Sequence, residues 1–269
     1  MIKFDSNENG MRLLDADFDQ PAPVAAPDLY LVCNLPRSGS WALCRMLLRL
    51  GLGLPSEYFH QVHGPAMAAR LGAPVAKAQP AWNYLAALLR TRATSSGHVG
   101  IKLNFNQLQL FFPGSSGARL LQRARLIYLY RQDVLAQAVS FNFAQTTGHW
   151  QKTGTPGLSI PGAAPDDLRR IDRMIDQLTS QEALWRRTFA KLGLRPFLVT
   201  HEEIVADTAG SLLRVARFLD AAPESIVPER IAAALETERA PDRPVQSGPS
   251  KGEVLAAYIA ARRTPRPQD

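Results

Sequence analysis

The sequence predicts an α/β fold in three layers, with a central, mostly parallel sheet between two layers of helices. Two observations predict this fold. Short apolar runs recur along the chain, and segments with helical spacing of apolar residues separate them, an alternation typical of parallel sheets. The chain has 269 residues, of which 46% are hydrophobic and 20% charged, so it is a globular protein long enough to bury a sizeable core.

Four apolar runs are predicted to form the strands of this sheet. They are Leu29–Asn34, Val99–Leu103, Arg125–Tyr130 and Phe197–His201. The first run follows a Pro- and Ala-rich segment, 21–27, which is typical of a linker. A polar turn at 35–40 and a helical pattern come directly after it, so the sequence predicts strand, glycine-containing loop and helix in that order.

Helices are predicted where apolar residues return every three or four positions. The segments are 41–50, 80–93, 133–146, 166–192, 207–220, 227–237 and 252–262. Asp133 and Asp207 stand where N-cap residues would be, and Gly193 stands where the long helix would end. The segment between Gly148 and Pro165 is rich in Gly, Pro, Ser and Thr, and we expect a loop of the length that often covers an active site.

One domain is expected at 29–262, with an N-terminal extension and linker at 1–28 and a frayed tail at 263–269. The residues at 1–19 lack the basic and then apolar regions of a secretory signal. The most apolar helical stretch, 42–54, is interrupted by two arginines and is too short to span a bilayer. We therefore expect a soluble, cytoplasmic protein without a transmembrane segment.

The cysteine content and the charge balance narrow the classes of protein further. Cys33 and Cys44 are too few for a disulfide framework, and they predict buried free thiols. No cluster of His and Cys has the spacing of a metal site, so we expect no metal. Lys and Arg number 31 against 24 Asp and Glu, and the net charge of +7 indicates an anionic ligand, nucleic acid, an acidic membrane surface or simply a basic solvated surface.

The strongest local motif is Pro36–Trp41, between the first predicted strand and the helix after it. A loop in this place exposes backbone N–H groups at a helix N-terminus, where the dipole favours an anion, and Ser38 and Ser40 add hydroxyl donors. It is not a Walker A loop, because the basic residue is Arg37, which precedes the glycine. The third strand is followed by Arg131 rather than by a Walker B aspartate. The sequence therefore predicts an anion held by arginine and backbone without Mg²⁺; the alternative is a well-capped turn.

A second anion site is predicted from Arg131 and Ser140. Arg131 lies at the carboxyl end of a predicted strand, which is where open α/β sheets bind ligands. Ser140 lies on the helix that Asp133 would cap. Both side chains are expected to face a second phosphate.

Four motifs in this order resemble the bacterial carbohydrate sulfotransferases typified by trehalose 2-sulfotransferase and, more distantly, the wider sulfotransferase superfamily. They are Arg37–Ser40, Gly53–Phe59, Gly100–Leu103 and Arg131–Ser140, followed by Trp150. The resemblance covers roughly residues 29–220 and implies a P-loop NTPase-like topology of the sulfotransferase kind. The sequence departs from the family at Trp41, where the family has Thr, and at Gln132, where it has Pro.

The resemblance implies transfer of a sulfuryl group from 3′-phosphoadenosine 5′-phosphosulfate (PAPS) to a hydroxyl of a carbohydrate or glycolipid. The loop residues that it implies for holding the phosphosulfate are Arg37, Ser38, Gly39, Ser40 and Trp41. Arg131 and Ser140 would hold the 3′-phosphate. Glu57 matches the family's general base, while Arg37 and Lys102 would balance charge on the transferred group and on the leaving phosphate. The family also implies a homodimer.

Other interpretations of these residues stay open from the sequence. His60 and His63 follow Glu57 closely and are rival bases, and Glu57 itself could be a helix cap. Lys102 could be an edge residue whose ammonium reaches solvent. The segment 247–252 faintly resembles the C-terminal phosphate loop of eukaryotic sulfotransferases, but a tail turn is the simpler interpretation.

Two other functions compete with sulfuryl transfer. A small-molecule kinase on a P-loop fold would depend on Mg²⁺ and ATP, and the missing Walker lysine and aspartate argue against it. A basic nucleic-acid-binding module would need a basic stripe or stacking aromatic residues, and neither is apparent, so no nucleic-acid partner is expected. The sequence does not identify the acceptor, although residues 55–95 and the loop 148–165 are expected to shape its site.

Overall fold

The computed structural model of the protein describes residues 14–20, 26–148, 150, 165–236 and 251–263. The chain divides into two compact units. The first consists of Met1–Tyr130 and Leu184–Arg239, and the second of Arg131–Ala183 and Ala240–Asp269.

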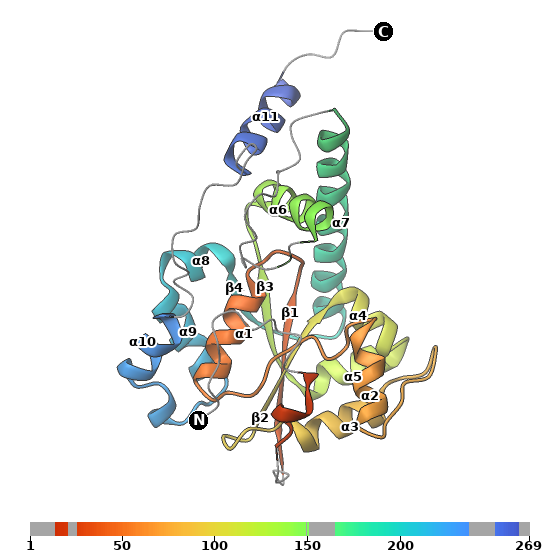
Figure 1. The fold of residues 1–269 in the computed structure, drawn as a ribbon, viewed down its shortest axis with the longest axis vertical. Helices are drawn as coiled ribbons and strands as arrows, with labels where there is room; N and C mark the ends of the chain where they lie inside the picture. The colour runs from red at the N-terminus through yellow and green to blue at the C-terminus, as the bar shows by residue number, and fades with distance from the viewer. Residues whose placement is uncertain (1–13, 21–25, 149, 151–164, 237–250, 264–269) are drawn as a thin grey trace. The chain divides into compact units, whose positions relative to one another are not determined.

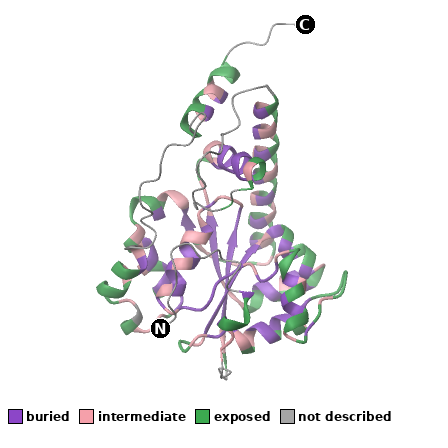
Figure 2. Ribbon diagram, in the orientation of Figure 1, coloured by how far each residue is buried: buried purple, intermediate pink, exposed green. Residues whose placement is uncertain are grey.

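The first unit contains a four-stranded sheet in which all neighbouring strands are parallel. Its strands are β1 (Asp28–Asn34), β2 (His98–Asn104), β3 (Arg125–Tyr130) and β4 (Phe197–Thr200), and they lie in the order β2-β1-β3-β4 (Figure 1). The strands β1, β2 and β3 consist almost wholly of buried residues, as is typical of parallel sheets (Figure 2). The predicted α/β fold with a parallel sheet is therefore confirmed.

Short helices surround this sheet in the first unit. They are α1 (Ser40–Arg49), α2 (His63–Arg70), α3 (Trp82–Thr91), α4 (Phe105–Phe111), α5 (Ser115–Arg123), α8 (His201–Ala206), α9 (Thr208–Phe218) and α10 (Pro228–Glu236), with the 3₁₀ helices η2 (Ala16–Phe18) and η3 (Pro223–Ser225). The second unit contains α6 (Val134–Thr147) and α11 (Lys251–Arg263). The long helix α7 (Pro165–Lys191) begins in the second unit and ends in the first.

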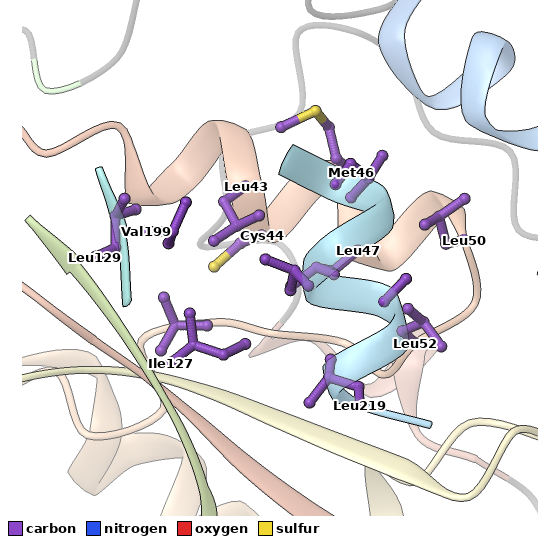
Figure 3. Close-up of a cluster of buried hydrophobic side chains, with 14 of the residues drawn as sticks. Leu43, Cys44, Met46, Leu47, Leu50, Leu52, Ile127, Leu129, Val199 and Leu219 are labelled. Carbon is purple, nitrogen blue, oxygen red and sulfur yellow. The ribbon is translucent and has the colours of Figure 1, made fainter. Parts of the chain in front are cut away.

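Alternate residues of β3 face opposite layers of helices in the first unit. Ile127 and Leu129 pack with side chains of α1, α9 and α10 in one apolar cluster (Figure 3). On the other face, the ring of Tyr128 contacts Trp185 and Phe189 of α7. Successive side chains of a strand point to opposite faces, so this unit has the predicted three layers, helix, sheet and helix.

Helix ends follow the capping residues that the sequence predicts. The carboxylates of Asp133 and Asp207 accept 2.8 Å hydrogen bonds from backbone N–H groups in the first turns of α6 and α9. Gly193 has a φ of 64° after α7, and the N–H of Leu194 donates to the carbonyl of Phe189 (2.9 Å), as in a Schellman motif. The seven predicted helices begin and end within two residues of the observed ones.

The predicted fourth strand is wrong in its last residue, because His201 begins a helix. The hydroxyl of Thr200 accepts a hydrogen bond from the N–H of Glu203 (3.0 Å), and the Glu203 carboxylate accepts one from the N–H of Thr200 (2.8 Å). This capping box ends β4 and starts α8. The sequence analysis also missed α2, α4, α5 and α8, which have six to nine residues each and give too short a pattern for periodicity to detect.

Cys33 and Cys44 are buried free thiols, as predicted. Burial raises the pKa of the Cys44 thiol to about 12, so this thiol stays protonated at neutral pH. In the part of the chain that the structure describes, no helix is long and apolar enough to cross a membrane.

Some predictions fall on residues outside the described ranges. They include 21–25 of the linker, most of the loop between 148 and 165, and all of the tail except Arg263. The division of the chain into an extension, one domain and a tail stays a prediction.

Candidate functional site

The loop that the sequence singles out lies between β1 and α1 (Figure 1). Arg37 has a φ of 64°, which is uncommon for a residue with a side chain, and such backbone strain clusters at functional sites. Gly39, with a φ of 85°, is the N-cap residue of α1. The N–H groups in the first turn of a helix have no partner within the helix, so this loop has the backbone geometry of an anion-binding turn.

Two buried serines and Asn34 hold the loop in place. The Ser38 hydroxyl donates to the carbonyl of Leu35 (2.8 Å), and the Ser40 hydroxyl donates to the side-chain oxygen of Asn34 (3.3 Å). The carbonyl of Asn34, the last residue of β1, accepts a hydrogen bond from the indole N–H of Trp185 (3.4 Å). The hydroxyls that the sequence assigns to a ligand therefore also order the loop itself.

His201, which the sequence analysis placed in a strand, packs against this loop. A Cβ atom added at Gly39 would lie 2.8 Å from Nδ1 of His201, so position 39 requires glycine both for its φ and for space. His201 follows the carboxyl end of β4, the edge at which parallel sheets bind ligands. Its position at the end of the predicted strand 197–201 was the sequence feature that could have identified it.

The predicted base, Glu57, lies beside two side chains from β2 and α4. Its carboxylate forms an ion pair with the ammonium of Lys102 and accepts a hydrogen bond from the amide of Gln107 (3.4 Å). The Lys102 side chain is 7% exposed and that of Glu57 is 17% exposed, so the pair is shielded from bulk water. Lys102 lies in the edge strand β2, but its ammonium binds Glu57 instead of reaching solvent. The Glu57 carboxylate is bound to side chains rather than to a helix terminus.

Gln107 is a site residue that the sequence analysis missed. Its backbone N–H donates to the side-chain oxygen of Asn104 (2.9 Å), and its Oε1 accepts a hydrogen bond from the N–H of Asn104 (3.0 Å). Because Oε1 accepts this bond, the NH₂ group is the part of the amide that faces Glu57. The spacing Asn-x-x-Gln after a strand is a capping-box pattern, which was the signal present in the sequence.

Two glycines let the chain before Glu57 approach β2 closely. Ser56 forms a bridge with this strand, and its carbonyl accepts a hydrogen bond from the N–H of Lys102 (2.9 Å). A Cβ atom added at Gly53 would lie 2.9 Å from the backbone nitrogen of Gly100. These glycines open two of the motifs quoted above, and their physical role is the close approach of two backbones that brings the base beside Lys102.

Trp41 connects the loop to the pair formed by Glu57 and Lys102. The Lys102 ammonium lies 4.8 Å from the centre of the Trp41 ring, a cation–π distance. Trp41 is the second residue of α1 and directly follows the loop. The departure from the family's threonine therefore replaces a hydroxyl with an aromatic face that contacts Lys102.

The surroundings of Glu57 keep its carboxylate ionised. Burial raises its pKa, but the charge of Lys102 and the hydrogen bonds from Lys102 and Gln107 lower it more. The net result is a pKa for Glu57 below the usual value of a glutamate.

The rival base His60 lies near Glu57 but is held by backbone groups. Its Nδ1 accepts hydrogen bonds from the N–H groups of Val62 (3.2 Å) and His63 (3.4 Å). Burial lowers the pKa of His60 and so favours the neutral imidazole. Because Nδ1 accepts these hydrogen bonds, the proton of the neutral ring is on Nε2. The nitrogen that could accept a proton therefore faces the backbone, which favours Glu57 as the base.

The second unit contains Arg131 and Ser140, the predicted second anion site. Arg131 directly follows β3, and Ser140 is a buried residue of α6. The ammonium of Lys251, at the start of α11, lies 3.5 Å from the Ser140 hydroxyl and 5.0 Å from the centre of the Phe143 ring. Lys251 and Gly252, the end of the segment 247–252, are the first residues of α11, and 247–250 lie outside the described residues.

Two solved structures of retinol dehydratase are similar to this chain at a low level. The structure in a complex with retinol and PAP has a TM-score of 0.46 and 16% sequence identity, covering 86% of this chain and 69% of its own. The structure in complex with androsterone and inactive cofactor PAP has a TM-score of 0.45 and 17% identity, covering 84% and 68%.

Comparison of the sequence with known proteins identifies the family. Trehalose 2-sulfotransferase of Mycolicibacterium smegmatis is 30% identical over 212 residues, which cover 65% of this chain and 78% of that protein. Trehalose 2-sulfotransferase of Mycobacterium tuberculosis is 29% identical over 209 residues, which cover 64% and 76%. A family model described as Stf0 sulphotransferase matches residues 29–242. This match spans the sheet and the loop described above, and the chain therefore belongs to the Stf0 sulphotransferase family and is a sulfotransferase.

Proposed function

We propose that this sulfotransferase moves a sulfuryl group from PAPS to a hydroxyl of a carbohydrate, with Glu57 as the general base. The observation that carries the proposal is the series of contacts from Trp41 to Lys102 to Glu57. It joins a shielded carboxylate and an ammonium to the loop at the start of α1. An alcohol needs a base to take its proton, and a transferred sulfuryl group needs cations to stabilise its charge.

The loop 35–40 fits the phosphosulfate end of this donor. It has a left-handed glycine at a helix N-terminus, and Trp41 brings the charge of Lys102 beside it. The residues proposed to hold the phosphosulfate are Arg37, Ser38, Gly39, Ser40 and Trp41. When bound, PAPS supplies an activated sulfuryl group on a phosphate that can leave.

Glu57 is proposed to take the proton of the acceptor hydroxyl as its oxygen attacks sulfur in line. A bond forms between that oxygen and sulfur, and the bond between sulfur and the bridging phosphate oxygen breaks. The electron pair of the broken bond leaves with adenosine 3′,5′-bisphosphate. Arg37 and Lys102 offset the negative charge that gathers on the bridging oxygen.

Arg131, Ser140 and Lys251 of the second unit are proposed to bind the 3′-phosphate of the donor. Two cationic side chains and a hydroxyl are the donors that a phosphate dianion binds most strongly. The contact between Lys251 and Ser140 supports placing both in one binding set.

A carbohydrate or glycolipid acceptor is proposed because two relatives are named trehalose 2-sulfotransferase. Incubation with labelled PAPS and a panel of trehalose, other glycans and glycolipids identifies the acceptor. Transfer to none of the sugar-containing compounds would contradict the acceptor class.

The homodimer, the cytoplasmic location and the absence of a metal stay predictions. Light scattering tests the first, and turnover in excess chelator tests the last.

Calorimetric titration tests the donor directly. Adenosine 3′,5′-bisphosphate is the ligand, and AMP is the matched control because it lacks only the 3′-phosphate. We expect AMP to bind at least about tenfold more weakly, since it loses charged hydrogen bonds to that phosphate. Equal affinities for the two nucleotides would overturn the proposal.

A further inference from the structure

Residues 14–20, which we name the N-terminal brace, lie before the part of the chain that matches the family, residues 29–242. The brace contains η2 and packs within the first unit. Phe18 forms a buried cluster with Leu48 and Leu54, and the N–H of Gln20 donates to the carbonyl of Thr91 (2.9 Å). The brace is therefore tied to this unit by both apolar packing and backbone hydrogen bonds.

One carboxylate of the brace, that of Asp19, bridges two arginines. Arg70 of α2 binds both of its oxygens, at 2.6 and 3.1 Å, and Arg92 at the end of α3 approaches it to 2.8 Å. The arginines also donate to carbonyls of the brace, Arg70 to that of Leu14 and Arg92 to that of Asp15, each at 3.0 Å. These bonds connect α2 and α3 through the brace.

The burial of Arg92 makes its contact with Asp19 important for the local structure. The Arg92 side chain is 0% exposed. Two of its nitrogens, Nε and Nη1, have no hydrogen-bond partner among the residues that the structure describes. A buried guanidinium is strongly destabilising unless a carboxylate compensates its charge, and Asp19 forms the ion pair that does so.

Arg92 also contacts Tyr58, the residue next to the proposed base Glu57. The Arg92 guanidinium lies 5.8 Å from the centre of the Tyr58 ring, and Tyr58 directly follows Glu57 in the chain. The Tyr58 hydroxyl donates to the carbonyl of Leu54 (2.5 Å), and the carbonyl of Tyr58 accepts a hydrogen bond from the Tyr84 hydroxyl of α3 (3.0 Å). Tyr58 is fully buried, so these contacts fix its position and that of the backbone at Glu57.

We propose that Asp19 is a positioning residue that, through Arg92 and Tyr58, holds Glu57 where its carboxylate meets Lys102 and the acceptor hydroxyl. This inference rests on the proposed role of Glu57 as the base. A displacement of a reacting group by about 1 Å can lower a rate by roughly 100-fold. A contact remote from the chemistry therefore has a measurable effect on turnover.

The variant Asp19→Asn tests the inference, because it keeps the side-chain shape and removes the charge. Its matched control is Asp17→Asn, since Asp17 is an exposed acidic residue of η2, the 3₁₀ helix that ends directly before Asp19. We expect Asp19→Asn to lower kcat/KM for the acceptor by roughly tenfold to 100-fold and to leave the affinity for adenosine 3′,5′-bisphosphate unchanged. Asp17→Asn is expected to change neither quantity, and Asp19→Glu to keep most of the activity.

A second measurement reports on Glu57 without turnover. Carbon NMR of glutamate-labelled protein follows the titration of the Glu57 carboxyl, which Glu57→Gln assigns. If Asp19→Asn moves the Glu57 carboxylate away from Lys102, the pKa of Glu57 rises. If the variant only loosens the structure elsewhere, the pKa of Glu57 does not change. If turnover experiments show that Glu57 is not the base, this titration still decides whether Asp19 positions it.

The results for these variants either support the inference or overturn it. A folded Asp19→Asn variant with unchanged kcat/KM and an unchanged Glu57 titration overturns the inference. If Asp19→Asn does not fold, Arg92→Lys decides, because it keeps a cation for Asp19 and removes the guanidinium that contacts the Tyr58 ring. A shift of the Glu57 titration to higher pH in Arg92→Lys supports the inference, and an unmoved titration overturns it.

Discussion

The ammonium of Lys102 forms an ion pair with the carboxylate of Glu57, and it does so while lying 4.8 Å from the centre of the Trp41 ring. This pairing has two opposite effects on Glu57, the proposed proton acceptor. It holds the carboxylate in one place and keeps it ionised, but it also lowers the pKa and with it the strength of the base. Glu57 is thus able to accept a proton at pH values below the usual titration range of a glutamate.

Replacing Glu57 with glutamine is expected to lower turnover by roughly 10²- to 10⁴-fold, since the amide cannot take the proton of the acceptor hydroxyl. The affinity for adenosine 3′,5′-bisphosphate is expected to stay the same. Transfer from labelled PAPS measures the first quantity, and calorimetry measures the second. His60→Gln is the control for the rival base; a loss in that variant as large as in Glu57→Gln would contradict the assignment.

Lys102→Met is expected to move the acid limb of the pH profile of kcat/KM to higher pH. The charge of Lys102 lowers the pKa of Glu57, so without that charge burial raises the pKa instead. Because Glu57 is proposed to act in its unprotonated form, we expect the variant to lose activity at a higher pH on acidification than the native enzyme. Lys102→Arg keeps the charge and should keep the native acid limb. Superimposable acid limbs for Lys102→Met and the native enzyme would rule out Glu57 as the titrating base.

Gly39→Ala is expected to abolish tight binding of adenosine 3′,5′-bisphosphate. The φ of 85° costs an alanine about 1–2 kcal/mol, and the added Cβ would also press on His201, 2.8 Å away. Gly51→Ala is the matched control, because Gly51 has a φ of 77° but no atom within 4 Å of an added Cβ. Thermal denaturation should show the backbone strain in both variants. Native bisphosphate affinity in Gly39→Ala would mean that the loop does not bind the donor.

Lys251→Met is expected to weaken binding of adenosine 3′,5′-bisphosphate by about tenfold and to leave binding of AMP unchanged, because Lys251 is proposed to contact only the 3′-phosphate. Lys251→Arg should retain most of the affinity. Arg263→Met, at the other end of α11, removes the same charge from an exposed position and serves as the control. An equal loss of AMP binding in Lys251→Met would argue against a contact specific to the 3′-phosphate.

Local patterns in the sequence were enough to predict much of the fold. The strand at 29–34, the glycine loop after it and the helix that follows each depend on neighbouring residues, and the structure has all three. The caps at Asp133 and Asp207 were predictable for the same reason, since a capping side chain bonds within its own first turn. The resemblance to a family added the expectation that Glu57 and the loop belong to one site. No local pattern in the sequence predicts that.

Contacts between distant parts of the chain were not predictable from these patterns. The amide of Gln107 reaches Glu57 only because the chain at Ser56 lies against β2. The pairing of Asp19 with Arg92 likewise joins segments that only the folded chain brings together. His201 was assigned to the wrong element, because a capping box at Thr200 outweighed its position after an apolar run.

The bridge between Ser56 and Ile101 has a consequence for altering the acceptor specificity of the enzyme. Along an extended segment, a slip of one residue turns a side chain to the opposite face, so the length of 53–57 must be conserved if Glu57 is to meet Lys102. The loop 72–80, between α2 and α3, lies outside this bridge. We therefore expect loops of different length to be exchangeable there while the register of Glu57 against Lys102 stays unchanged, and the panel of glycans shows whether such exchanges change the acceptor.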